Sequence, residues 1–269
     1  MTIQDIKDRW KSNRQDPQAA VEWWNGKAAD FASKELPTAE NSLTLRLILD
    51  NKMLESGQSA LDVGCGSGRF SFAMEQLGAQ VTGSDFSPRM IEECEKAKAS
   101  RGSSVNFHVN DWHNINLQDL GWYKRFDFVL ANMTPAIVSA DTFLKLSDAS
   151  RNRCLMVKPT KLSNVVLDKL TSLLGFASDT KTLDETLPYV FELLWLSGMK
   201  PKIEYEDEIW EHTWEVDDAI KEYTLRLSAS HTLSEQQKGL IAKFLHDVSV
   251  DNVVKETTHT TIAAVYWQV

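Results

Sequence analysis

Cysteine is scarce in this chain of 269 residues, which contains only three. Cys65, Cys94 and Cys154 lie far apart, and no CxxC motif or Cys/His cluster accompanies them. This spacing argues against a disulfide-stapled fold and against a structural zinc site, so we expect no metal ion. Isolated thiols are typical of proteins kept in a reducing compartment, which predicts a cytoplasmic protein.

Long apolar runs and basic segments are also missing. No stretch approaches the roughly 18 apolar residues that cross a bilayer, and the opening MTIQDIKDRW is charged rather than apolar. The formal charge is −9 at pH 7, and no run of lysines or arginines offsets it locally. We therefore predict a soluble protein with neither a membrane nor a nucleic acid as its partner.

Short strand-like runs alternate with helical segments through the first half of the chain. Residues 1 to 56 show helical periodicity without strand-like alternation. Strands are then predicted at 59–63, 79–85, 104–111, 126–133 and 154–159, with helices at 69–78, 88–100 and 141–150 between them. This alternation indicates a doubly wound α/β fold, in which helices cover both faces of a mostly parallel sheet.

The second half of the chain is less regular. Its periodicity predicts helices at 163–174, 184–197, 216–228 and 234–248, and strands at 202–214 and 257–269. These two strands would form an antiparallel hairpin at the sheet edge and bring the sheet to seven strands. No repeat, low-complexity tract or linker divides the chain.

The stretch LDVGCGSG at residues 61–68 follows the first predicted strand. Ligands of open α/β sheets bind at the carboxyl ends of the strands, and glycines there let a ligand approach the backbone. A purely structural turn would also use three glycines. However, the spacing is GxGxG instead of the GxGxxG of dinucleotide sites, and Asp62 would repel a pyrophosphate. An acid at this position suits a ligand that carries an ammonium group.

Acidic residues also end the second and third predicted strands. Asp85 follows the first glycine by roughly 20 residues, the separation at which a carboxylate can bind both hydroxyls of a ribose. Asp111 precedes Trp112, so a carboxylate could accept from an adenine amino group while the ring packs on the base. Asp85 could instead favour a helix N-terminus, and Asp111 could be an ordinary loop acid. Three acids around one glycine loop favour a nucleoside site.

On these residues the chain resembles the class I S-adenosylmethionine-dependent methyltransferases. The family motif hh(D/E)hGxGxG matches residues 61–68, and the acids after its second and third strands match Asp85 in GSDFSPRM and Asp111 in NDWH. The resemblance covers residues 59 to about 157. It implies an N-terminal helical cap at 1–56 and a methyltransferase domain at 57–269, with a cofactor half at 57–160 and an acceptor half with helical additions at 161–269.

The resemblance also implies which residues hold S-adenosylmethionine. Asp62 would interact with the methionyl amino group, and Asp85 would hold the ribose. The other residues implied at the cofactor are Gly64, Cys65, Gly66, Phe86, Met90, Asp111, Trp112 and Asn132.

A weaker match lies upstream, where Trp24, Ala28 and Phe31 share one helix face. It is similar to the WxxxAxxY segment that covers the cofactor in small-molecule members of the family, with Phe31 in place of the tyrosine. Trp24 is therefore predicted at the cofactor, although an aromatic stripe facing the core would show the same spacing.

The acceptor side is less clearly marked. Asn132 and Thr134 follow the fourth predicted strand in FDFVLANMTPAI, and we predict that they line the acceptor pocket. This segment lacks the [DN]PP[YF] signature of family members that methylate amide or exocyclic nitrogens. His113 and His212 are the candidate general bases, although a lone histidine is more often a surface residue.

The sequence thus predicts an enzyme that transfers a methyl group from S-adenosylmethionine to a small-molecule acceptor by in-line displacement, with S-adenosylhomocysteine as product. Two alternatives stay open. One is a methyltransferase that acts on protein or RNA, and the other is a non-catalytic protein that only binds S-adenosylmethionine.

Overall fold

The computed structural model describes residues 1–12, 17–176, 184, 186–228 and 231–269. The chain divides into two compact units. Unit 1 comprises Met1–Lys158, Glu185–Glu204 and Ala263–Val269, and unit 2 comprises Pro159–Asp184 and Tyr205–Ile262. The predicted division into a cap and a methyltransferase domain at residue 56 stays a prediction.

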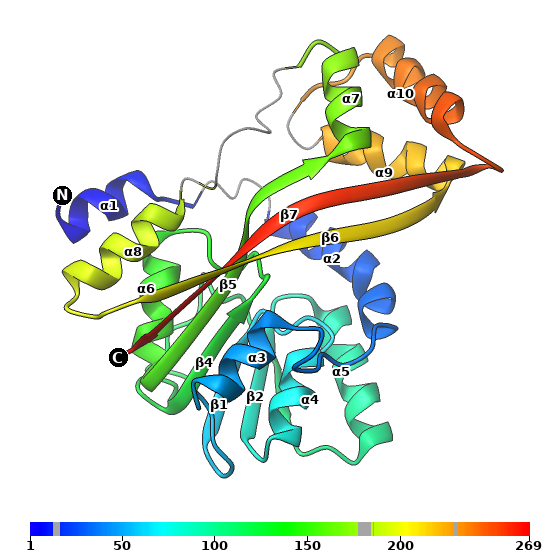
Figure 1. Ribbon diagram of the computed structural model, residues 1–269. Helices are drawn as coiled ribbons and strands as arrows, with labels where there is room; N and C mark the ends of the chain where they lie inside the picture. The colour runs from blue at the N-terminus through cyan, green and yellow to red at the C-terminus, as the bar shows by residue number, and fades with distance from the viewer. Residues whose placement is uncertain (13–16, 177–183, 185, 229–230) are drawn as a thin grey trace. The chain divides into compact units, whose positions relative to one another are not determined.

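The described residues form a seven-stranded sheet with the order β3-β2-β1-β4-β5-β7-β6 (Figure 1). Its strands are β1 (Ser59–Val63), β2 (Gln80–Asp85), β3 (Asn106–Val109), β4 (Phe126–Asn132), β5 (Ser150–Asn164), β6 (Lys202–Glu215) and β7 (Val253–Gln268). Strands β1 to β5 pair in parallel, and β7 runs opposite to β5 and β6 in Figure 1. The strand order reverses between β1 and β4, which is where such sheets bind ligands. The predicted fold class is confirmed.

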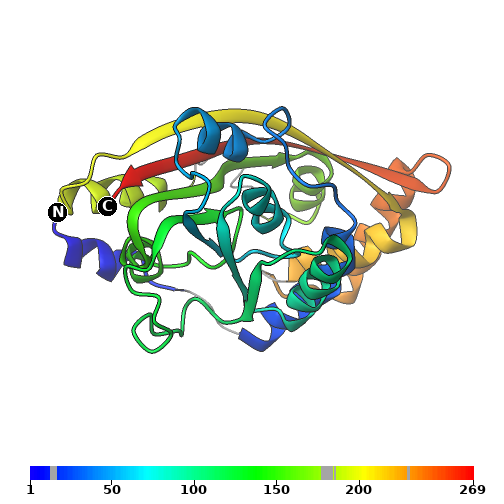
Figure 2. The same cartoon turned by 90° about the horizontal axis from the view of Figure 1, so that it is seen from below.

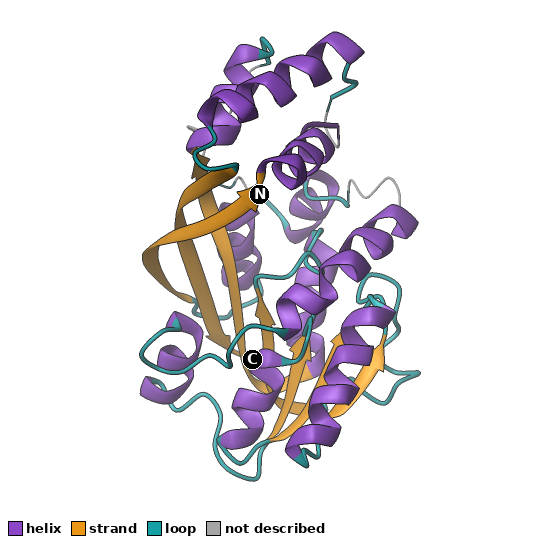
Figure 3. Ribbon diagram, turned by 90° about the vertical axis from the view of Figure 1, so that its right-hand side faces the viewer, coloured by secondary structure: helices purple, strands orange, loops and turns teal. Residues whose placement is uncertain are grey.

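Helices lie on both sides of the parallel strands (Figure 3). Unit 1 contains α1 (Ile3–Arg9), α2 (Pro17–Ala32), α3 (Leu43–Asp50), α4 (Arg69–Gln76), α5 (Pro88–Arg101), α6 (Ala140–Ala149) and α8 (Thr186–Leu196). Unit 2 contains α7 (Val165–Leu173), α9 (Val216–Ser228) and α10 (Glu235–Val248). None of the helices formed by the described residues combines the length and the apolar composition needed to span a bilayer.

Helix α2 lies beside α5 (Figure 2). The side-chain oxygen of Asn25 in α2 accepts hydrogen bonds from the Ser87 hydroxyl (2.7 Å) and the Arg89 backbone N–H (3.3 Å). Ser87 is also the N-cap of α5, because its hydroxyl accepts from Met90 N. Asn25 therefore fastens α2 to the first turn of α5, directly after the end of β2.

The core of unit 1 is formed by apolar side chains from the sheet and from α1, α6 and α8. Phe126 and Phe143 are almost completely buried, and Phe143 packs against Trp10 with ring centroids 6.0 Å apart. Each large side chain of this kind contributes about 1.5–3 kcal/mol through burial. This packing fixes the positions of the strand ends on which a site depends.

The structure differs from the predicted elements at several boundaries. Strand β3 is shorter than the predicted 104–111, because Ser104 bonds to Glu75 instead of to a neighbouring strand. Strand β5 extends well beyond the predicted 154–159. Strands β6 and β7 are neighbours at the sheet edge as predicted, and α9 and α10 connect them where helices were predicted.

Unit 2 has its own core, built by α7, α9, α10 and β7, and it contains a buried ionic cluster. The Arg226 guanidinium donates to Glu222 (2.9 Å) and to both oxygens of Glu256 (3.2 Å). Glu256 also accepts from the Tyr223 hydroxyl (2.6 Å) and the Trp214 indole (3.3 Å). The side chains of Glu222 and Glu256 are only 10% and 9% exposed, so the single positive charge of Arg226 partly neutralises two nearly buried carboxylates.

Replacing Arg226 with methionine is expected to lower the free energy of unfolding by about 2–4 kcal/mol, because two nearly buried carboxylates lose their cation. Urea unfolding followed by circular dichroism measures this change. The control is Lys221→Met, since Lys221 pairs with Asp218 on the exposed face of the same helix. That variant should change stability by less than about 0.5 kcal/mol. Equal effects of the two substitutions would contradict a stabilising role for the cluster.

Candidate functional site

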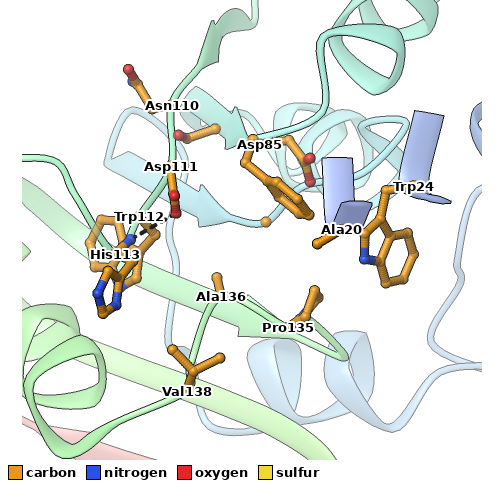
Figure 4. Close-up of a pocket in the computed structure, with 13 residues that line it drawn as sticks. Ala20, Trp24, Asp85, Asn110, Asp111, Trp112, His113, Pro135, Ala136 and Val138 are labelled. Atoms are coloured by element: carbon orange, nitrogen blue, oxygen red, sulfur yellow. Dashed lines mark hydrogen bonds between the residues drawn. The ribbon is translucent and has the colours of Figure 1, made fainter. Parts of the chain in front are cut away.

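A cavity of about 170 Å³ lies at the carboxyl ends of the parallel strands in unit 1 (Figure 4). Segments that follow four successive strands of the chain, β1 to β4, line it together with helix α2. The lining residues are Ala20, Trp24, Gly64, Ser84, Asp85, Phe86, Asn110, Asp111, Trp112, His113, Pro135, Ala136 and Val138. The cavity thus occupies the place where the strand order reverses.

The glycine loop after β1 forms one wall. Gly64 and Gly66 have φ angles of +67° and +54°, which favour glycine. A Cβ atom on Gly64 would lie 1.8 Å from the Thr134 hydroxyl oxygen, so the loops after β1 and β4 approach each other closely. A Cβ atom on Gly66 would meet nothing within 4 Å, although Gly66, predicted at the cofactor, is not among the residues that line the cavity. The nearby Ser67 hydroxyl is buried and has no hydrogen-bond partner among the described residues.

Asp85 is held rigidly at the end of β2. Its side chain accepts from Gly66 N (3.0 Å) and from Ser87 N (2.8 Å), one bond to each carboxylate oxygen. Burial raises the pKa of Asp85, and these backbone N–H groups oppose that rise. Each carboxylate oxygen can accept a second hydrogen bond, so Asp85 can bind two further donors in the cavity.

Asp111, Trp112 and His113 form a turn after β3. The Asp111 carboxylate accepts from His113 N (3.1 Å) and from the Asn114 side chain (3.0 Å). The Trp112 ring is 3% exposed, and its indole N–H donates to Thr142 O (2.9 Å). Trp24 and His113 lie at opposite ends of the cavity in Figure 4. A flat apolar wall with a carboxylate beside it suits an aromatic base that carries an amino group.

Asp62 belongs to β1, directly before the glycine loop, and does not line the cavity. It is 2% exposed, and it accepts a hydrogen bond of 2.6 Å from the Ser71 hydroxyl. Burial raises the pKa of Asp62 from 3.8 to about 7, although the Ser71 hydroxyl opposes the rise. Asp62 therefore binds a proton more readily in the folded protein than in the unfolded chain.

This shift predicts how stability depends on pH. As pH rises from about 4 to about 7, the unfolded chain has lost the Asp62 proton while the folded protein still holds it, so stability falls through this window and levels off above it. Urea unfolding at pH 5 and pH 7.5 measures the change. We expect the ligand-free protein to lose more stability across this interval than its Asp62→Asn variant does. A larger loss in the variant would contradict this assignment.

Several predicted site residues lie away from the cavity. Met90 is buried in α5, Cys65 belongs to the glycine loop without lining the cavity, and the Asn132 side chain accepts from the Thr44 hydroxyl (2.6 Å). The Thr134 hydroxyl accepts from Ala136 N (3.1 Å). His212 is an exposed residue of β6 in unit 2, where its ring packs on Trp214. The roles predicted for these residues stay predictions.

The structure brings seven of the predicted residues together around the cavity, namely Trp24, Gly64, Asp85, Phe86, Asp111, Trp112 and His113. The other six lining residues were not predicted, namely Ala20, Ser84, Asn110, Pro135, Ala136 and Val138. These side chains are small, neutral or apolar and form no chemical pattern of their own. Their nearness to predicted residues in the sequence was the only available signal.

The chain is similar to known proteins over the segment that builds this cavity. Residues 54–174 match the family model described as a methyltransferase domain. The chain is 31% identical over 102 residues to ubiquinone biosynthesis O-methyltransferase of Xanthomonas axonopodis pv. citri, covering 38% of this chain and 41% of that protein. It is 36% identical over 89 residues to ribosomal protein L11 methyltransferase of Helicobacter hepaticus, covering 33% and 27%. The matched segment spans less than half the length of either relative.

Solved structures share the fold at lower sequence identity. A protein from Bacillus halodurans superposes with a TM-score of 0.51 at 13% identity, covering 84% of this chain and 99% of that one. Phosphoethanolamine N-methyltransferase 2 of Haemonchus contortus, in complex with S-adenosyl-L-methionine, also gives a TM-score of 0.51, at 15% identity, with coverage of 100% and 60%. The match over residues 54–174 shows a methyltransferase domain in this chain, the glycine loop and the acids after β2 and β3 lie within it, and the solved structures share its fold.

Proposed function

We propose that this protein transfers a methyl group from S-adenosylmethionine to a small-molecule acceptor by in-line displacement. The observation that carries the proposal is the position of Asp85. Its carboxylate lines the cavity, two backbone N–H groups hold it, and each of its oxygens can still accept a hydrogen bond. This arrangement matches the two adjacent hydroxyls of a ribose.

The other residues of the cavity fit the remainder of the cofactor. Phe86 and Trp112 supply apolar surface for the adenine ring, and Asp111 supplies an acceptor for its amino group. The open backbone at Gly66 leaves room beside the loop. The unpartnered Ser67 hydroxyl gains a hydrogen bond if a polar group of the ligand reaches it, because a buried polar atom without a partner is unfavourable.

When bound, S-adenosylmethionine supplies a methyl group on a positively charged sulfur. A nucleophilic atom of the acceptor forms the new bond to this carbon while the carbon–sulfur bond breaks, and S-adenosylhomocysteine is released. Residues of the chain would hold the reactants in line and exclude water, which accounts for much of the acceleration in such reactions. His113, at one end of the cavity, is the candidate to take a proton from an acceptor that must lose one.

The walls of the cavity favour a small acceptor. Trp24, Pro135, Ala136 and Val138 present apolar surface. The formal charge of −9 disfavours a nucleic acid as the acceptor. Two of the relatives, ubiquinone biosynthesis O-methyltransferase and phosphoethanolamine N-methyltransferase 2, are named for small molecules, whereas the L11 methyltransferase is named for a protein. A protein acceptor is therefore the main alternative.

Calorimetric titration with S-adenosylmethionine and S-adenosylhomocysteine, followed by mass spectrometry of the reaction mixture, tests the proposal. We expect both compounds to bind, and we expect S-adenosylhomocysteine to accumulate when small phenols and amines are offered. Methyl transfer only to protein in a cell extract would refute the small-molecule acceptor. Binding without turnover on any acceptor would favour a non-catalytic binding protein.

A further inference from the structure

Helix α6 contacts both loops that form the cavity wall after β3 and β4. On one side it begins directly after Val138, and the backbone N–H groups of Val138 (3.0 Å) and Ser139 (2.9 Å) donate to the Thr142 hydroxyl in its first turn. On the other side the Trp112 indole N–H donates to the carbonyl oxygen of Thr142 (2.9 Å). One turn of α6 thus connects two cavity walls that are separate in the sequence.

Lys145, one turn further along α6, binds the backbone of the turn after β3. Its ammonium group donates to the carbonyl oxygens of Trp112 (2.8 Å), Ile115 (2.9 Å) and His113 (3.3 Å). An ammonium group has three protons, so these bonds use all of them. Lys145 therefore has no proton directed into the cavity, and the geometry favours a positioning role over a catalytic one.

The surroundings of Lys145 keep it in this place. Burial lowers the pKa of Lys145, while the nearby carboxylates of Asp111, Asp141 and Asp148 oppose that shift. The nitrogen also lies 5.6 Å from the centre of the Trp112 ring, within the range of a cation–π contact. The same cation therefore contacts both the backbone and the ring of a cavity residue.

Two sets of bonds would still hold this turn without Lys145. One set is accepted by the side chain and the carbonyl of Asp111, and the other is the bond from the Trp112 indole to α6. The Asp111 carbonyl accepts from Asn114 N (2.9 Å) and Ile115 N (3.1 Å). The Asp111 bonds lie within the turn, so without Lys145 only the indole bond of Trp112, among the bonds of the described residues, would connect this turn to α6. Lys145 is the residue that ties its carbonyl groups to the helix at three points.

We propose that Lys145 is a positioning residue that holds Asp111 and Trp112 in the geometry that binds the adenine group, and so sets the affinity of the site for adenosyl ligands. The inference rests on the proposed function, because it presumes that an adenosyl ligand occupies the cavity.

The binding test compares Lys145→Met with Lys124→Met by calorimetric titration of adenosine and S-adenosylhomocysteine. Lys124 is a matched control, since it donates to a single carbonyl of the same helix, that of Ser147 (2.9 Å). We expect Lys145→Met to lower the affinity for both ligands by a similar factor of about ten, because both carry the adenosyl group. This factor is the scale of one charge-assisted hydrogen bond. The control should change neither affinity by more than about twofold. Wild-type affinity for both ligands in a folded Lys145→Met protein would overturn the proposal.

Hydrogen exchange of the ligand-free protein separates this inference from the proposed function. The amides of residues 113–115 should exchange faster in Lys145→Met than in wild type, and at the wild-type rate in Lys124→Met. If wild-type protein binds neither ligand, the proposed function fails, while unchanged exchange in Lys145→Met refutes the positioning role by itself. If the methionine variant does not fold, Lys145→Arg replaces it, and its planar donors should produce a smaller shift in the same direction.

Discussion

Replacing Asp85 with alanine is expected to lower the affinity for S-adenosylhomocysteine by about 100-fold or more. This factor corresponds to the loss of two hydrogen bonds to a charged acceptor, each of which contributes about 1.5–3 kcal/mol. The Asp85 side chain lies in the cavity wall and is oriented by Gly66 N and Ser87 N. Calorimetric titration measures the change.

The control for this result is an acid at the opposite end of the sheet. Asp127, in the first part of β4, accepts from Arg151 (2.7 and 2.9 Å) and from Ser59 N (2.9 Å), so it is as firmly held as Asp85. Asp127→Ala should reduce stability while leaving the ligand affinity unchanged. If the two alanine variants lost affinity equally, the loss would reflect damage to the sheet, and Asp85 would have no special part in binding.

Replacing Gly64 with alanine is the second substitution with a large expected effect. The added methyl group would lie 1.8 Å from the Thr134 hydroxyl oxygen and 2.7 Å from the Thr134 Cβ atom, and the φ angle of +67° disfavours alanine. Overpacking and left-handed strain together predict a loss of about 2–5 kcal/mol in the free energy of unfolding. Urea unfolding of the ligand-free protein measures it.

Two further variants separate the causes of this loss. Gly66→Ala introduces the same kind of backbone strain, at φ +54°, into a place where nothing lies within 4 Å, so it should cost only about 1–2 kcal/mol. Removing the facing side chain with Thr134→Gly should recover part of the Gly64→Ala loss. If the double variant were no more stable than the sum of the two single effects predicts, the close approach of these loops would not be the cause.

Several residues predicted at the cofactor line one cavity because the fold places them at fixed points. Gly64 comes directly after β1, Asp85 is the last residue of β2, and Asp111 lies just beyond β3. Because the carboxyl ends of parallel strands meet at one edge of the sheet, residues far apart in the chain line one cavity. A local pattern was therefore enough to identify them.

The acceptor side could not be predicted in the same way. The acceptor-pocket roles of Asn132 and Thr134 stay predictions, and no pattern indicated that the Asn132 side chain accepts from Thr44, 88 residues away, or that Thr134 lies close to Gly64. Lys145 contacts Trp112, 33 residues earlier in the chain. Contacts of this kind depend on how distant loops approach each other, and neither periodicity nor a motif records them.

In unit 2, too, the sequence predicted the helices and strands but not the contacts between distant side chains. The helical periodicity of residues 216–228 correctly predicted α9, and the final strand was expected from its β-branched residues. Neither pattern indicated that Arg226 and Glu222 of α9 would meet Glu256 of β7 in a nearly buried cluster. Charged residues on a helix usually face solvent, so the exception appears only once the helix is packed against the sheet.

The most direct test of the central claim is a crystal structure of the protein with S-adenosylhomocysteine. We expect the ribose hydroxyls to lie within hydrogen-bond distance of the Asp85 carboxylate and the adenine ring to contact Phe86 and Trp112. Ligand bound elsewhere on the protein, or an adenosyl group that leaves Asp85 without a contact, would contradict it.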